Sequence, residues 1–186
     1  MKNIMKEILF STFPTLTTDR LRLRRLLKKD AKEITALRSD KSVNEFIDRP
    51  QSITAEEANQ FIENIQKKIV NRESLYWVIE LKDEKTFLGT ICLFNFSAEK
   101  KQAEIGFELL PVFQGRGFMQ EAIASVILLG FEEMCLQRIT AWTNPANQRS
   151  LNVLMKNKFR RDKDFQFANP EETGNYNVYY LEKDFC

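Results

Sequence analysis

The chain has 186 residues, of which 43% are hydrophobic and 29% charged, the composition of a globular protein with one domain. Its formal net charge of +2 is nearly balanced, and it contains no histidine. The lack of histidine excludes Ser-His-Asp and Cys-His hydrolases, zinc sites with histidine ligands and a histidine general base. Acid–base chemistry must therefore come from carboxylates, Lys, Tyr, Ser or water.

No stretch reaches the roughly 18 consecutive apolar residues that a membrane helix needs. Residues 1–13 carry one short apolar patch interrupted by Lys and Glu, which is not a signal peptide. We therefore expect a cytoplasmic protein that does not bind a membrane. Cys92, Cys135 and Cys186 are isolated and lack metal-ligand spacing, so we expect free thiols and no metal site.

The first half of the chain predicts two strands in a hairpin, preceded by a strand and two helices. Leucine and arginine alternate over residues 21–26, which indicates a strand with one solvated face rather than a nucleic-acid-binding arm. Asp30 opens a helix, and Thr54 followed by Glu57 is a capping box at the start of the next. That second helix has one apolar face, formed by Ala58, Phe61, Ile62, Ile65 and Ile69. The β-rich runs 75–81 and 87–94 flank a polar turn.

The second half of the chain alternates strands and helices. Strands are expected at 103–110, 139–143, 159–167 and 177–181, and helices at 118–134 and 150–157. Only the strand–helix–strand unit from 107 to 143 requires a parallel crossover. These elements predict a single domain over residues 1–186 in the α/β class (mixed α+β), with a mixed, mostly antiparallel twisted sheet flanked by helices.

The segment 114–117, Gln-Gly-Arg-Gly, joins the strand at 103–110 directly to a helix. Gly115 and Gly117 permit a tight turn with exposed backbone N–H groups, and the helix dipole adds positive potential, so this turn suits a pyrophosphate. Arg116 can add a charge-assisted contact. A plain strand-to-helix turn remains the alternative. Phe118 and Met119 exclude a P-loop, and Gln120 excludes a dinucleotide fingerprint.

Two further groups of polar residues are candidates for chemistry. Asn147 and Ser150 stand three apart at the start of the helix at 150–157, where they are either functional or only capping residues. Glu104 and Glu108 lie on one face of a strand, about 13 Å apart, so they cannot form a close carboxylate pair. Each of these two is either catalytic or part of a solvated strand face.

Taken in order, several short segments resemble the GNAT superfamily of N-acetyltransferases, in particular the branch that acetylates ribosomal-protein N-termini. The resemblance covers nearly the whole chain. The segments that carry it are residues 16–23, 104–107, 114–118, 147–150 and 156–159. It departs from the family at Met119, where a small residue is usual, at Lys158, where glycine is usual, and at Leu154, where many members carry a Tyr general acid.

The resemblance implies roles for named residues. The phosphate loop would be Gln114, Gly115, Arg116, Gly117, Phe118 and Met119. The backbone of Leu109 and Leu110 would pair with the pantetheine arm, and Asn147 would organise cofactor or water. Ser150 would serve as general acid in place of the missing Tyr, and Glu104 as a possible base.

The implied activity is transfer of an acetyl group from acetyl-CoA to a primary amine, directly and without a metal. The amine would belong to a peptide N-terminus or a small molecule, and residues 46–54, 56–70 and 169–175 would select it. We expect no nucleic-acid partner, and a homodimer is possible. A non-catalytic acyl-CoA-binding or regulatory module is the alternative.

Overall fold

The computed structural model describes residues 12–165 and 176–183. The strands are β1 (Leu16–Thr17), β2 (Leu21–Arg25), β3 (Ser74–Leu81), β4 (Phe87–Ser97), β5 (Gln102–Leu109), β6 (Arg138–Thr143), β7 (Arg160–Arg161) and β8 (Asn177–Glu182). The helices are η1 (Lys28–Asp30), α2 (Ala31–Arg38), α3 (Lys41–Asn44), α4 (Ala55–Val70), η2 (Pro111–Phe113), α5 (Phe118–Leu128), the π-helix η3 (Leu129–Glu133) and α6 (Gln148–Lys156). None of the described helices is long and apolar enough to cross a membrane.

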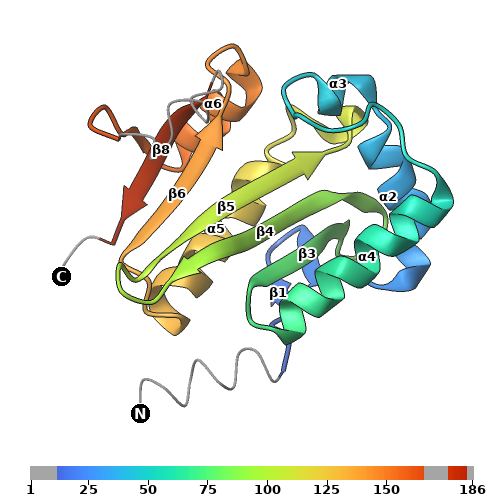
Figure 1. Ribbon diagram of the computed structural model, residues 1–186, viewed down its shortest axis with the longest axis horizontal. Coiled ribbons are helices and arrows are strands. Elements are labelled where there is room, and N and C mark those ends of the chain that lie inside the picture. The colour runs from blue at the N-terminus through green and yellow to red at the C-terminus, as the bar shows by residue number, and fades with distance from the viewer. Residues whose placement is uncertain (1–11, 166–175, 184–186) are drawn as a thin grey trace.

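The strands form one sheet in the order β1-β2-β3-β4-β5-β6-β8-β7 (Figure 1). Every neighbouring pair is antiparallel except β5 and β6, which are parallel and joined through α5. The predicted mixed, mostly antiparallel sheet with one parallel crossover is therefore confirmed. This crossover brings the Gly-rich turn and the start of α5 to the carboxyl end of β5.

Each face of the sheet packs against its own helices (Figure 1). The larger core joins α5 and α6 to one face and contains Trp77, Ile91 and Ile105. The smaller core joins α2 and α4 to the opposite face and contains Tyr76 and Val78. Alternation along each strand thus supplies two apolar surfaces, which is why neighbouring residues of β3 enter different cores.

The local sequence signals act largely as expected. Thr54 and Glu57 exchange both capping-box bonds, at 3.1 and 2.6 Å, at the start of α4. Leu21 and Leu23 of β2 are fully buried, as the alternation predicts. The strand expected at 159–167 comprises only Arg160–Arg161 within the described residues, and positions 166–167 lie outside them. The short elements β1 and α3 were not predicted.

Lys158 occupies a left-handed position that explains why the family uses glycine there. Its φ is +63°, directly after α6. The Lys158 N–H donates to Met155 O at 2.9 Å and the Phe159 N–H to Leu154 O at 3.1 Å, which is the Schellman pattern that closes a helix. A side chain at this φ is strained, whereas glycine is not.

Lys158→Gly should therefore stabilise the protein by about 0.5–1 kcal/mol, because relief of the left-handed strain exceeds the added entropy of the unfolded chain. The measurement is the free energy of unfolding in urea. Lys158→Ala is the matched control, since it removes the charge but keeps a Cβ, and it should bring no gain. Equal stability of the two variants would show that the backbone conformation is not the cause.

Candidate functional site

A cavity of about 650 Å³ lies where the parallel strands β5 and β6 separate. The two strands pair at only three positions, which end with Glu104 opposite Thr140. Beyond that point, residues from Ile105 on β5 and from Ala141 on β6 line the cavity. Figure 1 shows the two strands diverging toward the end at which α3 and α6 lie.

The free edge of β5 leaves backbone groups available inside the cavity. Backbone groups of successive strand residues point alternately to the two neighbouring strands. The Leu110 N–H donates to Leu88 O at 2.9 Å, on the β4 side. The N–H of Leu109 therefore faces the side from which β6 has departed. Leu109 lines the cavity, whereas Leu110 does not.

The turn that follows β5 leads straight into α5. Gly115 and Gly117 have φ of +75° and +79°, and Gly117 is the residue that caps α5. A Cβ built on Gly115 would meet no atom within 4 Å, so the space beside it is open. Within the described residues, the N–H groups of Phe118, Met119 and Gln120 find no acceptor. These donors and the helix dipole fit a phosphate group.

Residues from β5 and from the N-terminal region hold this turn in place. Gln114 Nε2 donates to Leu109 O at 2.8 Å. Arg20 donates from Nη1 to Arg116 O at 3.0 Å and from Nε to Glu121 Oε2 at 2.7 Å. Burial raises the pKa of Glu121, but its hydrogen bonds from Thr18 and Arg20 outweigh that effect and leave the pKa below its usual value. The carboxylate therefore stays charged and holds the turn.

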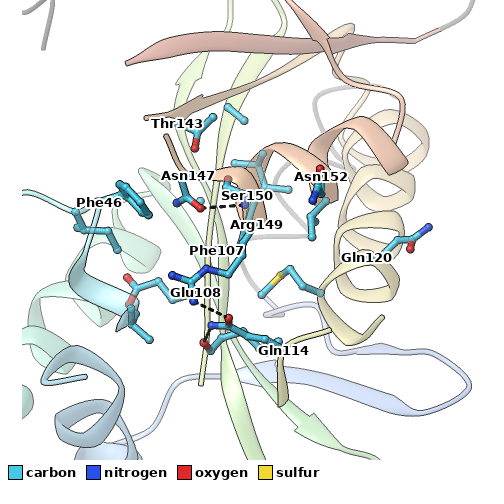
Figure 2. A pocket seen from close by; sticks show the side chains of 18 of the residues that line it. Phe46, Phe107, Glu108, Gln114, Gln120, Thr143, Asn147, Arg149, Ser150 and Asn152 are labelled. Atoms are coloured by element: carbon cyan, nitrogen blue, oxygen red, sulfur yellow. Dashed lines mark hydrogen bonds between the residues drawn. The ribbon is translucent and has the colours of Figure 1, made fainter. Parts of the chain in front are cut away.

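The start of α6 forms the opposite wall. Asn147 Oδ1 accepts from the Ser150 N–H at 3.0 Å, as the dashed line in Figure 2 shows, so Asn147 caps the helix. Ser150 lines the cavity, and its hydroxyl has no partner among the residues that the structure describes. Arg149 reaches out from the same turn to Glu45 at 2.8 Å and to Gln114 Oε1 at 3.3 Å. This arginine thus joins α6 both to the loop after α3 and to the phosphate turn.

Comparison with known proteins identifies the family. The model of the acetyltransferase (GNAT) domain matches residues 20–160. YoaA, an uncharacterized N-acetyltransferase of Bacillus subtilis (strain 168), is 30% identical over 171 residues, which are 89% of this chain and 97% of the relative. YnaD of the same organism, also an uncharacterized N-acetyltransferase, is 31% identical over 89% of this chain and 94% of its own. The chain belongs to the GNAT acetyltransferase family.

Solved structures agree on this GNAT fold. RimL, a ribosomal L7/L12 alpha-N-protein acetyltransferase solved with coenzyme A, has a TM-score of 0.79 at 18% identity and covers 92% of this chain and 99% of its own. A GNAT-family acetyltransferase from Bacillus anthracis has a TM-score of 0.72 at 27% identity, covering 90% and 96%. The resemblance to the ribosomal-protein branch is thus confirmed as a likeness of fold. The named relatives support an acetyltransferase over a non-catalytic module.

Most of the predicted site residues line this cavity. Those that line it are Leu109, Gln114, Gly115, Gly117, Phe118, Met119, Asn147 and Ser150. Arg116 and Glu104, like Leu110, do not line it. The Arg116 guanidinium instead lies over the Phe118 ring, 4.9 Å from its centroid. Met119, which departs from the family pattern, is 6% exposed and packs in the larger core. Leu154, at the usual Tyr position, is fully buried.

The two carboxylates of β5 have different surroundings. Glu104, at the last pair before the strands separate, accepts a hydrogen bond from Asn95 Nδ2 at 3.0 Å, and burial raises its pKa. Glu108 lines the cavity, and both of its oxygens accept from Arg49 at 2.8 Å.

The ion pairs of Arg49, Arg149 and Arg20 could not be predicted from the sequence, because the partner of each arginine lies about 60 to 100 residues away along the chain. Residues 169–175, predicted to select the acceptor, lie outside the described residues.

Proposed function

We propose that the protein transfers the acetyl group of acetyl-CoA to the primary amine of a peptide N-terminus or a small molecule. The observation that best supports this proposal is one cavity lined by the start of α5, by Leu109 at the edge of β5, and by Ser150. Two structural neighbours support the choice of co-substrate, since RimL was solved with coenzyme A and the microcin C7 self-immunity protein MccE with acetyl-CoA and AMP. Acetyl-CoA supplies an activated thioester when bound.

In this proposal each part of the cavity binds one portion of the co-substrate. The pyrophosphate binds to backbone N–H groups at the start of α5 and in the turn at Gln114–Gly117. No side chain is needed for these contacts. The Leu109 N–H, on the edge of β5 that β6 no longer covers, donates to an amide carbonyl of the pantetheine arm. This arrangement directs the thioester toward Ser150 and Asn147.

The reaction proceeds by direct transfer. The neutral amine forms a bond to the thioester carbon, the carbon–sulfur bond breaks, and the amine loses a proton while the departing thiolate gains one. Before the attack, Glu104 accepts a proton from the ammonium form of the acceptor through water. The Ser150 hydroxyl then donates a proton to the departing thiolate and regains one from the nitrogen. Cys92 lies beside the cavity residue Gly106, where burial and the charge of Glu108 raise the pKa of its thiol to about 12. A thiol held protonated in this way does not act as a covalent nucleophile.

Coenzyme A should raise the melting temperature of the protein, because binding to the folded state alone stabilises it by mass action. Gly117→Val should abolish that shift, since a β-branched residue at a φ of +79° distorts the turn and displaces its N–H groups. Gly117→Asn is the matched control: asparagine adopts positive φ more readily, so most of the shift should remain. A full shift in folded Gly117→Val would place the cofactor elsewhere.

Ser150→Ala should lower kcat by about tenfold to a hundredfold, at or just below the low end of general acid–base effects, because a thiolate is already a fair leaving group. The affinity for coenzyme A should stay within about threefold, since the lost contact acts in the transition state.

Asn147→Ala separates this role from helix capping. It should cost about 1 kcal/mol of stability, because Asn147 supplies the cap, whereas Ser150→Ala should leave the melting temperature nearly unchanged. Full turnover by Ser150→Ala would remove Ser150 from the chemistry.

Glu104→Gln should lower kcat/KM by at least about tenfold near neutral pH, because the amine then arrives as an ammonium ion that must lose a proton. The loss should shrink as the pH rises and the amine deprotonates without help. A pH profile of kcat/KM for the variant and the unaltered enzyme measures both effects. A loss below about twofold at every pH would reduce Glu104 to a structural residue.

A further inference from the structure

The cavity extends beyond the proposed cofactor site to a wall of apolar side chains. Val43, Phe46 and Ile47, in and after α3, line it together with Phe107 of β5 and Tyr176. Val43, Phe46 and Ile47 are half-buried, so part of each side chain faces open space. In Figure 2, Phe46 and Glu108 lie on the opposite side of Ser150 from Gln120 and Asn152. An acceptor that approaches Ser150 from this side therefore meets aromatic and aliphatic surface.

The one carboxylate that lines the described part of this cavity, Glu108, is already neutralised. Its two oxygens accept from Nη1 and Nη2 of Arg49 at 2.8 Å, and the Arg49 side chain is 7% exposed. Arg49 Nε in turn donates to Asn44 Oδ1 at 2.7 Å, and Asn44 is 1% exposed. This bidentate geometry commits the carboxylate to the arginine. It leaves little net charge to attract an ammonium group.

Other charged residues near the cavity also make it unfavourable for an acceptor with a second positive charge. Arg38 lies close enough to Arg49 and Glu108 for their charges to act on it, and its pKa is lowered by burial first and then by the charge of Arg49. The remaining charged residues that line the described cavity are the cations Arg149 and Lys156. A second positive charge on an acceptor would therefore meet Lys156, Arg149 with its partner Glu45, and the Arg49–Glu108 pair, with no unpaired carboxylate among the described lining residues.

We infer that the acceptor is a monoamine whose amino group is attached to an aromatic or bulky aliphatic group, and that Arg49 excludes diamines and polyamines by neutralising Glu108. This deepens the proposed acetyl transfer and rests on it. A free arylalkylamine and a peptide N-terminus with an apolar first residue present the same chemistry. The apolar wall binds the side group, while the amine lies toward Ser150 and the thioester.

A panel of acceptors tests the inference on the unaltered enzyme. Phenylethylamine and a pentapeptide that begins with Phe represent the two sources of apolar monoamine, and putrescine, spermidine and a Lys-initiated pentapeptide represent acceptors with a second charge. Thiol release from acetyl-CoA should give kcat/KM at least about tenfold higher for one or both apolar acceptors than for any of the others. Equal or higher values for the polyamines overturn the inference. Absence of thiol release with every amine, despite coenzyme A binding, instead contradicts the proposed function.

Phe46→Ala tests the apolar wall directly. It should raise KM for phenylethylamine, or for the Phe-initiated peptide if that is the better acceptor, by about tenfold, the effect of losing part of a buried ring. The melting-temperature shift caused by coenzyme A should not change. Val70→Ala is the matched control and should leave KM unaltered, because Val70 is 72% exposed at the end of α4 and does not line the cavity. An unchanged KM in Phe46→Ala would place the acceptor elsewhere.

Arg49→Met should change the specificity, because it leaves the Glu108 carboxylate free to accept an ammonium group. The ratio of kcat/KM for spermidine to that for the best monoamine should rise at least tenfold. The double variant Arg49→Met/Glu108→Gln removes both charges, so it avoids a buried unpaired carboxylate and should keep the original preference. A ratio in folded Arg49→Met that matches the unaltered enzyme, or a double variant that prefers spermidine, would refute the assigned role of Arg49.

Discussion

Every backbone N–H and C=O of a buried strand needs a partner, and β5 loses those supplied by β6 after only three residue pairs. From Ile105 onward the edge of β5 faces a cavity instead of a strand. The same strand then ends in a turn whose helix presents N–H groups with no acceptor within the described chain. The early separation of two parallel strands thus creates both a slot for an extended polar chain and an anion site at one end of it. The proposed co-substrate has that shape, with amides in its arm and phosphates beyond.

The segments that line such a site must keep fixed positions relative to one another. Ion pairs and hydrogen bonds between residues far apart in the sequence fix these positions. Arg20, next to β2, ties down the turn before α5 through Arg116 O and Glu121. Arg49 fixes the segment after α3 against Glu108 of β5. Arg149 connects α6 with Glu45. Isolated surface ion pairs contribute little stability, and buried ones often offset their own desolvation cost. Their effect here is positional, since each joins a different wall to the framework.

The parts of this design that local patterns encode could be predicted from the sequence. Hydrophobic periodicity located the main strands and helices, the Thr54–Glu57 capping box located the start of α4, and the glycines at 115 and 117 indicated the turn. The left-handed conformation of Lys158, with a φ of +63°, is a backbone property that a lysine in the sequence does not indicate. The ion pair of Arg49 with Glu108 spans 59 residues, and neither residue stands out in the sequence. Periodicity carries no information about which charged side chains meet across the fold, so the neutralised acceptor wall could not be predicted.

The charges of the cavity favour the two proposed substrates for the same reason. A co-substrate with several phosphate charges gains from the start of α5 and from Lys156 and Arg149, which line the cavity. Two unit charges about 8 Å apart interact by roughly 2 kcal/mol at an effective dielectric constant near 20. An added ammonium group that lies about this far from Lys156 would be opposed by a term of that order, whereas a monoamine that binds neutral avoids it. The acceptor is then selected by its apolar group and by the lack of an unpaired carboxylate on the described acceptor side of the cavity. A cavity built for polyamines needs unpaired carboxylates on its acceptor side, and Arg49 occupies the one that the described residues provide there.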